Sequence, residues 1–360
     1  MEQGELQSDH AGRGAVVCYR LPHETYGQEL SQSSDVRTFS SAEQLPLSGG
    51  YVIAPFQVSS DCPILLIQPD HIRQLQLQAD DSWPRTPTCT DDSVEQALYR
   101  QAFDSAHVRL MRGELEKIVL SRRLRVRFAP IASGPSASAH HTLLSWGRSL
   151  FLKACAAYPE CFIAFWWTPI SGAWIMATPE PILQKRNGTW STVALAGTRP
   201  FGQSAVWSDK NKKEQAIVAQ FITEKLQNVA TNVETSDTYA FRTGRIEHLR
   251  TDFHFQLSDE ASALQLLRHL HPTPAVCGMP RDAALQAILH DEHSSRRYYA
   301  GFSGPLNCQG RTNLFVSLRC AELLSDQATL YAGGGIMPES AEADEWDETR
   351  RKLTTMQSLF

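Results

Sequence analysis

Short apolar segments of this chain follow one another with only a few residues between them. Residues 161–168 and 173–178 form one such pair, and residues 314–324 and 328–332 form another. A connection of a few residues joins antiparallel strands, whereas parallel strands need a crossover of a dozen residues or more. We therefore expect large antiparallel sheets, and a regular alternation of strands and helices around a parallel sheet is disfavoured.

Helical periodicity of apolar residues separates these groups of strands. It occurs at 209–228, 259–270, 280–291 and 342–357. A further alternating strand is expected at 189–196. Strands joined as hairpins and interspersed with helices predict an α+β protein whose antiparallel sheets are covered by helices.

The charge balance excludes several classes of protein. Lys and Arg number 34 and Asp and Glu 39, so the net charge is −5 and the basic excess of a duplex nucleic-acid binder is missing. No apolar run reaches the ~18 residues of a membrane span, and the first residues lack the basic and apolar parts of a signal peptide. The eight cysteines are dispersed without zinc-ligand spacing. We expect a cytoplasmic enzyme that binds neither nucleic acid nor membrane.

The segment 117–128 alternates with a period of two residues, as a strand does. Its apolar side chains share one face. The opposite face carries Lys117, Arg123, Arg125 and Arg127. For the three arginines the favoured interpretation is a solvated basic surface.

Carboxylates gather near the C-terminus. In the predicted helix 342–357, Glu345, Glu348 and Lys352 follow one another at intervals of three and four residues, and they therefore share one stripe. This stripe is either an ordinary salt-bridged surface or part of a Mg²⁺ site, because Mg²⁺ takes one or two carboxylates and leaves positions for an anionic substrate. Glu214, near the start of another predicted helix, is by itself an acid stabilised by the helix dipole.

A run of three glycines, AGGGI at 332–336, follows a predicted strand. We expect a bulge or tight turn there. Glycines in such a place let the backbone approach another group closely.

Seven short motifs, taken in order, resemble those of one enzyme family. They are KIVLSR at 117–122, ATPE at 177–180, LAGTRP at 195–200, HPTPA at 271–275, LRCA at 318–321, AGGGI at 332–336 and EWDETRRK at 345–352. Each motif is weak alone, but the ordered set is highly specific. The chain resembles the chorismate-utilising enzymes, which include isochorismate, salicylate, anthranilate and aminodeoxychorismate synthases, and it resembles the isochorismate synthases most.

The resemblance implies a single domain with two large, mostly antiparallel sheets flanked by helices. Residues 93–360 would form the chorismate-binding catalytic region. Residues 1–92 would be an N-terminal segment of the same fold with a polar tail, and residues 1–45 are expected to be loosely packed. Chorismate, a small dianion, is the expected partner. We expect a monomer without a glutaminase subunit, because such a subunit serves the family members that use ammonia.

The resemblance also implies roles for individual residues. Lys117 would be the general base and Glu180 the general acid of a reaction in which water adds at C2 of chorismate and hydroxide leaves C4. Glu214 and Glu348 would bind Mg²⁺, with Glu345 beside the metal directly or through water. The residues expected to bind the substrate are Gly197, Thr198, His248, Ala275, Arg319, Gly333 and Lys352. The implied activity is Mg²⁺-dependent isochorismate synthesis, and menaquinone biosynthesis is the expected pathway.

Single positions separate this prediction from its alternatives. Ala196 stands where aminodeoxychorismate synthases carry a nucleophilic lysine, and anthranilate synthases typically lack a lysine at the position of Lys117. Ala275 is small, whereas members that go on to eliminate pyruvate tend to have threonine there. A salicylate synthase and an isochorismate synthase of a siderophore pathway stay open as alternatives. A non-catalytic chorismate-binding protein is the distant one, because the lysine and the acids named above are all present.

Overall fold

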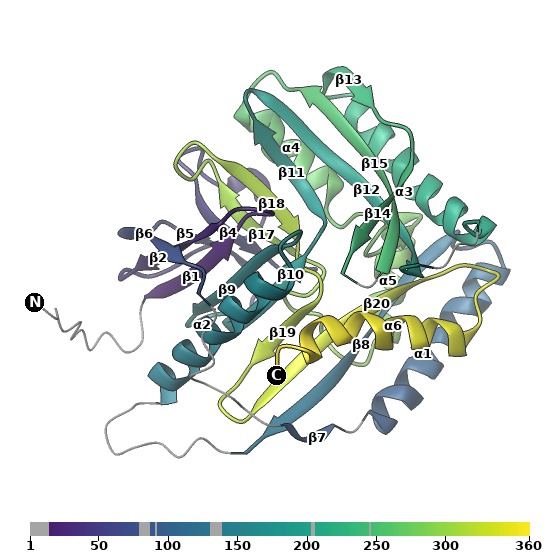
Figure 1. Ribbon diagram of the computed structural model, residues 1–360. Helices are drawn as coiled ribbons and strands as arrows, with labels where there is room; N and C mark the ends of the chain where they lie inside the picture. The colour runs from purple at the N-terminus through teal and green to yellow at the C-terminus, as the bar shows by residue number, and fades with distance from the viewer. Residues whose placement is uncertain (1–13, 79–86, 91, 130–138, 203–205, 245) are drawn as a thin grey trace, which may run out of the picture.

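The computed structural model describes residues 14–78, 87–90, 92–129, 139–202, 206–244 and 246–360. Within these residues the chain forms two ten-stranded sheets and six α-helices (Figure 1). The strand pairs are antiparallel in both sheets. The predicted α+β class, with two large antiparallel sheets flanked by helices, is confirmed.

The first sheet joins strands from both ends of the chain. Its order is β16 (Gly278–Met279), β8 (Lys117–Phe128), β20 (Gln327–Ile336), β19 (Cys320–Leu323), β10 (Gly172–Thr178), β9 (Phe162–Thr168), β1 (Ala15–Arg20), β2 (Tyr26–Gln32) and β6 (His71–Gln76), and β7 (Pro87–Thr90) also pairs with β8. In Figure 1 the long strands β8 and β20 lie side by side although some two hundred residues separate them in the sequence.

The second sheet is built in the same way. Its order is β13 (Thr231–Thr235), β15 (Ile246–Gln256), β12 (Thr189–Pro200), β11 (Pro181–Arg186), β18 (Thr312–Val316), β17 (Phe302–Leu306), β4 (Gly50–Ala54), β5 (Ile64–Ile67) and β3 (Arg37–Phe39), with β14 (Tyr239–Thr243) paired to β15. The short 3₁₀ turn η1 (Ala42–Gln44) follows β3.

The helices cover the sheets. They are α1 (Ser93–Met111), α2 (Ala139–Ala157), α3 (Asp209–Gln227), α4 (Glu260–Leu270), α5 (Arg281–Asp291) and α6 (Glu342–Gln357). Helix α6 lies along β20, α1 along β8, α2 along β9 and β10, and α3 along β12 (Figure 1). The four helices expected from periodicity are confirmed, whereas α2 was not predicted.

Two apolar clusters hold these layers together. The larger one lies between the sheets, where the rings of Phe162 and Phe315 stack with centroids 4.3 Å apart. The smaller one packs Trp146 of α2 and Leu353 of α6 against the apolar face of β8. Burial of this area is the main stabilising contribution to the fold.

The predicted strand 314–324 is wrong, because this segment is two strands in different sheets. Strand β18 ends at Val316 in the second sheet, and β19 begins at Cys320 in the first. The chain crosses between the sheets at residues 317–319, where Arg319 has a φ of 45°. A non-glycine residue in this left-handed region is uncommon and is a feature of strained or functional positions. The continuous apolar pattern could not reveal the change of sheet.

The conformation of the glycine run at 332–336 also differs from the predicted one. It lies inside β20, and Gly333, Gly334 and Gly335 pair with residues of β8. The expected bulge or turn is therefore wrong, although the expected close approach of the backbone to other groups is confirmed below.

The predicted loose packing of residues 1–45 is wrong from Ala15 onward, because β1 and β2 are largely buried. The boundary expected at residue 92 stays a prediction.

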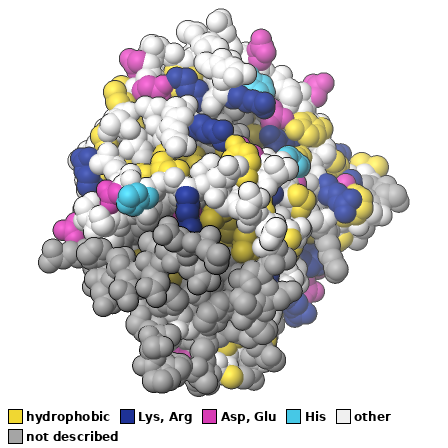
Figure 2. All heavy atoms as spheres, turned by 60° about the vertical axis from the view of Figure 1, so that its left-hand side comes forward, with side chains coloured by type: hydrophobic (Ala, Val, Ile, Leu, Met, Phe, Trp, Pro, Cys, Tyr) yellow, Lys and Arg dark blue, Asp and Glu magenta, His cyan; other side chains and the backbone are white. Residues whose placement is uncertain are grey.

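The described surface carries charges of both signs. Figure 2 shows Lys and Arg side chains interspersed with Asp and Glu on the visible part of one face. Among the described helices, none has the length and apolarity needed to cross a membrane.

Candidate active site

A cavity between the two sheets collects most of the residues to which the sequence assigns a role. Its lining includes Glu180, Gly197, Thr198, Glu214, His248, Ala275, Arg319, Gly333 and Lys352. They come from β12, β15, β20, α3 and α6, and from the connections between β10 and β11, between α4 and β16, and between β18 and β19. Their convergence depends on the two sheets facing each other.

Lys117 and Glu214 form a buried ion pair beside this cavity. Glu214 lines the cavity, whereas Lys117 is not among its lining residues. Lys117 is the first residue of β8 and is fully buried, and its Nζ lies 3.1 Å from Oε1 of Glu214. Among the described residues this Nζ has no acceptor in hydrogen-bonding alignment. A buried ammonium with one carboxylate neighbour is poorly satisfied, which is typical of functional sites.

A glycine makes room for this ion pair. A Cβ on Gly335 would lie 2.2 Å from Oε1 of Glu214 and 3.1 Å from Cε of Lys117. A Cβ on Gly334 would be no nearer than 3.4 Å to any atom, which is an ordinary contact. The glycine run thus brings the backbone of β20 against the ion pair.

We expect Gly335→Ala to displace the Glu214 carboxylate. The substitution should lower the free energy of unfolding by on the order of 3 kcal/mol, because Lys117 would then be buried without a partner. Gly334→Ala is the matched control and should cost less than about 1 kcal/mol. Chemical denaturation of both variants measures these values. Equal costs would contradict the packing described.

Glu180 is a buried carboxyl group on another wall of the cavity. It follows β10, and its backbone carbonyl accepts a hydrogen bond of 2.9 Å from the amide of Val316. Burial raises the pKa of Glu180 to about 7, and the positive charges of Lys117 and Lys352 limit the rise. A carboxyl group with this pKa can donate a proton at neutral pH.

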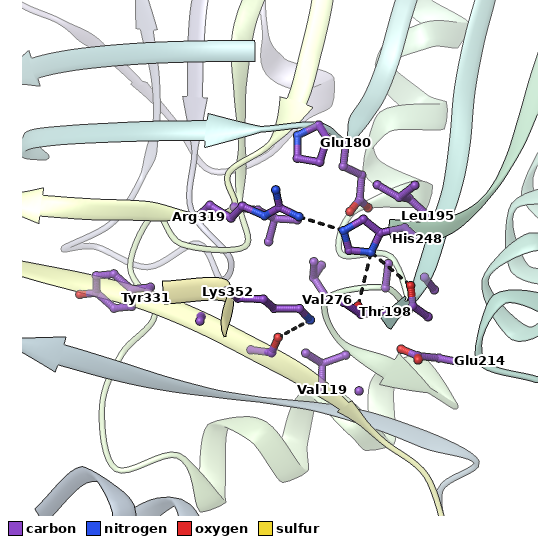
Figure 3. A pocket seen from close by; sticks show the side chains of 18 of the residues that line it. Val119, Glu180, Leu195, Thr198, Glu214, His248, Val276, Arg319, Tyr331 and Lys352 are labelled. Atoms are coloured by element: carbon purple, nitrogen blue, oxygen red, sulfur yellow. Dashed lines mark hydrogen bonds between the residues drawn. The ribbon is translucent and has the colours of Figure 1, made fainter. Parts of the chain in front are cut away.

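His248 and Arg319 hold one another in place. Nη2 of Arg319 lies 2.8 Å from Nε2 of His248, and Nδ1 of His248 lies 3.1 Å from the carbonyl oxygen of Gly197. The carbonyl only accepts and the guanidinium only donates, so His248 is neutral with its proton on Nδ1. Burial, together with Arg319, lowers the pKa of His248 well below its usual value. Figure 3 shows the two side chains directed at each other across the cavity.

A bulge in β12 supports this arrangement. The register between β12 and β15 shifts between Ala196 and Thr198, and Gly197 has a φ of +69°. The bulge turns the Gly197 carbonyl toward His248, and Oγ1 of Thr198 lies 3.4 Å from the same ring nitrogen. Gln215 of α3 stabilises the strand beside the bulge, because its Oε1 accepts a hydrogen bond of 2.9 Å from the backbone amide of Ala196.

Helix α6 carries the predicted stripe. Nζ of Lys352 donates to the carbonyl of Gly333 at 2.8 Å and lies 2.8 Å from Oε1 of Glu348. Burial alone would raise the pKa of Glu348, but the ammonium of Lys352 lowers it below its ordinary value. Gly333 presents its carbonyl to Lys352.

A lysine that the sequence analysis missed lies among the three predicted metal ligands. Lys210 of α3 forms an ion pair with Glu345, and it also interacts electrostatically with Glu214 and Glu348. Burial disfavours the charge on Lys210, but Glu345 raises its pKa above the usual value. The available signal was spacing, because Lys210 precedes Glu214 by one helical turn.

The carboxylates match a hard cation in chemistry but are engaged by lysines. Among the described residues, no group of three His, Cys, Asp or Glu side chains is arranged as a metal site. Oε2 of Glu345, however, is buried without a hydrogen-bond partner among them. Burial and the neighbouring Glu348 raise the pKa of Glu345. A divalent cation bound there would satisfy this oxygen and would compete with Lys210.

Two aromatic residues of the cavity wall were also missed. Tyr299 and Tyr331 stack with ring centroids 5.5 Å apart and both line the cavity. Neither belongs to a motif or shows a local pattern that would mark it. Their role in the wall follows from the pairing of β20 with its neighbours.

Comparisons with known proteins identify the family of this chain and agree with its fold. The family model for chorismate binding enzymes matches residues 61–360. The isochorismate synthase EntC of Escherichia coli K12 is 30% identical over 278 residues, which cover 74% of this chain and 68% of that protein. The salicylate biosynthesis isochorismate synthase of Pseudomonas aeruginosa is 35% identical over 220 residues, which cover 58% of this chain and 44% of that protein. The chain belongs to the chorismate-binding enzyme family.

The fold of a solved relative is also similar. The menaquinone-specific isochorismate synthase MenF of Escherichia coli superposes with a TM-score of 0.76 at 22% identity, covering 99% of this chain and 92% of that one. The similarity to the chorismate-utilising enzymes seen in the sequence is therefore confirmed, and the relatives named here are isochorismate synthases, which are isomerases. The roles expected for individual residues stay predictions.

Proposed function

We propose that this enzyme converts chorismate into isochorismate. The observation that carries the proposal is one cavity lined by Glu214, which is paired with the buried Lys117, and by a buried carboxyl group, Glu180, whose pKa is about 7. Chorismate is a dianion, and Arg319 and Lys352 provide positive charge on the wall of the same cavity. A guanidinium can hold a carboxylate with two parallel hydrogen bonds.

The reaction requires two proton transfers. Water adds to C2, the ring double bonds shift, and the bond between C4 and its hydroxyl oxygen breaks. Lys117, which must first lose the proton that it carries in its ion pair with Glu214, takes a proton from the attacking water. Glu180, in its protonated form, gives a proton to the departing hydroxyl group, which leaves as water. The proton gained by Lys117 and the proton lost by Glu180 balance, and exchange with solvent restores both groups.

We propose Mg²⁺ as the cofactor, held by Glu214 and Glu348 with Glu345 beside it. The support is the chemistry of the three carboxylates and the unpartnered Oε2 of Glu345. When bound, Mg²⁺ supplies a Lewis acid that neutralises substrate charge. The residues of the chain position the substrate, with Arg319 and Lys352 as its cationic contacts.

Two substitutions should change Mg²⁺ affinity in opposite directions. Glu348→Gln removes a carboxylate and should weaken Mg²⁺ binding by tenfold or more, corresponding to about 1.4 kcal/mol. Lys210→Met removes the competing ammonium and should strengthen Mg²⁺ binding by about the same factor. Isothermal titration with MgCl₂, and the rise in Tm that Mg²⁺ causes, measure the effect without turnover. If both variants bind Mg²⁺ like the unmodified protein, the assignment of these carboxylates is wrong.

The pathway and cellular setting are part of the same proposal. We assign the enzyme to menaquinone biosynthesis, acting in the cytoplasm as a monomer without a glutaminase subunit. A siderophore-pathway isochorismate synthase and a salicylate synthase are the alternatives. The alanine at position 196 and the alanine at position 275 support the assignment against the amino-transferring and pyruvate-eliminating members.

Product analysis tests the function directly. The purified protein is incubated with chorismate, with and without MgCl₂ and with and without ammonium, and the products are separated and identified. Isochorismate alone supports the proposal. Salicylate with pyruvate indicates a salicylate synthase, an amino product indicates the nitrogen-transferring branch, and no turnover indicates a binding protein.

A further inference from the structure

A second hollow lies on the same face of β8 and β20 as the active-site cavity. Residues directly opposite in an antiparallel pair share a face, and so do alternate residues along each strand. Lys117 and Val119 therefore lie on the same side of the sheet as Arg123 and Arg125, which are farther along β8. Tyr331 of β20 lies opposite Arg123 and shares this side. A groove of about 440 Å³ is found over this farther part.

The groove is strongly cationic. We name it the arginine groove and define it by Arg123, Arg125, Arg127, His293 and Arg297. Arg297 pairs with Glu322, Arg123 lies 3.2 Å from Glu95, and Arg127 also has an interaction partner. Among the described residues that line the groove, Glu322 is the one that carries a carboxylate.

Arg125 is the exposed cation at the centre of this series. It makes no hydrogen bond or ion pair with any residue that the structure describes, and its neighbours Arg123 and Arg127 lie about 7 Å away along the same strand face. Like charges so placed repel one another, and a bound anion would relieve the repulsion.

The floor and wall of the groove are shaped and polar. Tyr331 and Thr329 form the floor, and Figure 3 shows the Tyr331 hydroxyl directed away from the other labelled side chains of the active-site cavity. Arg297 has a φ of 49° and its guanidinium lies 5.8 Å from the ring centroid of Trp174. A left-handed arginine fixed against an aromatic ring is a preorganised cation, not a freely moving one.

We propose that the arginine groove is a second, non-catalytic binding site for a small molecule that carries two or more carboxylate or phosphate groups. Its volume lies within the usual range for small-molecule sites. Guanidinium groups recognise carboxylates and phosphates with the same paired hydrogen bonds. The site is separate from the proposed reaction, because its cations come from the far part of β8 and from the segment before β17.

Titration with two anions tests the proposal. Isothermal titration calorimetry at low salt uses citrate for the carboxylate class and pyrophosphate for the phosphate class. At least one of them should bind, and its affinity should fall about tenfold in Arg125→Gln, as expected for the loss of a charge-assisted hydrogen bond. Binding of citrate alone or pyrophosphate alone identifies the class.

Two control variants keep the test decisive. Arg186→Gln removes another exposed arginine, at the end of β11 in the second sheet, and should leave the affinity unchanged. Arg319→Gln removes the arginine of the active-site cavity and should also leave it unchanged. The proposal is overturned if neither anion binds at millimolar concentration, if Arg125→Gln binds like the unmodified protein, or if Arg319→Gln abolishes binding. Because Arg125 is exposed, circular dichroism should show an unaltered fold in its variant.

Discussion

Replacing Lys117 by alanine is expected to lower kcat/KM for chorismate by roughly 10²–10⁴-fold, the usual contribution of one general acid or base. Lys117 is fully buried, 3.1 Å from Glu214 of the cavity lining, whereas Arg125 and Arg127 on the same strand face are exposed. Without the lysine, no group at this position would take the proton from the attacking water. Substrate binding should survive, because Arg319 and Lys352 are unchanged.

A variant of similar size separates a base from a merely structural lysine. Lys117→Met should show the same loss of kcat/KM as Lys117→Ala while filling most of the space, which separates packing from proton transfer. Lys212→Ala, which removes an exposed lysine of α3, should change the rate less than twofold. A loss of less than about threefold in Lys117→Ala would refute its role as base.

Replacing Glu180 by glutamine should abolish the acid step and also stabilise the fold above neutral pH. The rate should fall by roughly 10²–10⁴-fold, because glutamine has no proton to give to the departing hydroxyl group. In the unmodified enzyme, kcat/KM should fall as the pH rises through about 7, where Glu180 loses its proton. This limb should be absent in Glu180→Gln.

The effect on stability follows from the same burial. Burial raises the pKa of Glu180 from its ordinary value of 4.5 to about 7, so between these values the folded protein holds more protons than the unfolded chain. The contribution of Glu180 to the free energy of unfolding is therefore fully present below about pH 4.5, and it is lost as the pH rises through about 7. The difference in pKa corresponds to roughly 3 kcal/mol.

Chemical denaturation at two pH values checks this result. Glu180→Gln should have the higher free energy of unfolding at pH 8.5, by up to about 3 kcal/mol, and a weaker dependence on pH than the unmodified protein. A variant that is less stable at pH 8.5 would show that the Glu180 carboxylate is favourable in the folded state. Loss of activity together with gain of stability is the pattern of a residue retained for chemistry.

Local patterns in the sequence were enough for most elements and for part of the site. The hairpin of β9 and β10 follows from two apolar runs with a short connection, because the alternation and the turn are both local. The stripe of Glu348 and Lys352 on α6 follows from helical spacing alone, and the two side chains are 2.8 Å apart. The motifs were enough to identify the family.

Other features needed contacts between residues far apart in the chain. The glycine run looks like a turn in isolation, but its three glycines are paired with residues of β8, and pairing with a distant strand overrides local glycine preference. Arg319 reaches the cavity because the chain changes sheet between β18 and β19, which no periodicity records. Lys210 meets Glu345 only because α3 and α6 converge.

The sequence by itself determined the class of the fold, the family and the residue types at the site, because strand alternation, helical spacing and motif order are properties of neighbours along the chain. The tertiary structure decided the electrostatics of the site. The pKa of Glu180 is set by the removal of water from around it and by charges brought from β8, α6 and the sheet crossing. Burial and long-range charge arise only when the two sheets close over the cavity, so these properties could not be read from the order of residues.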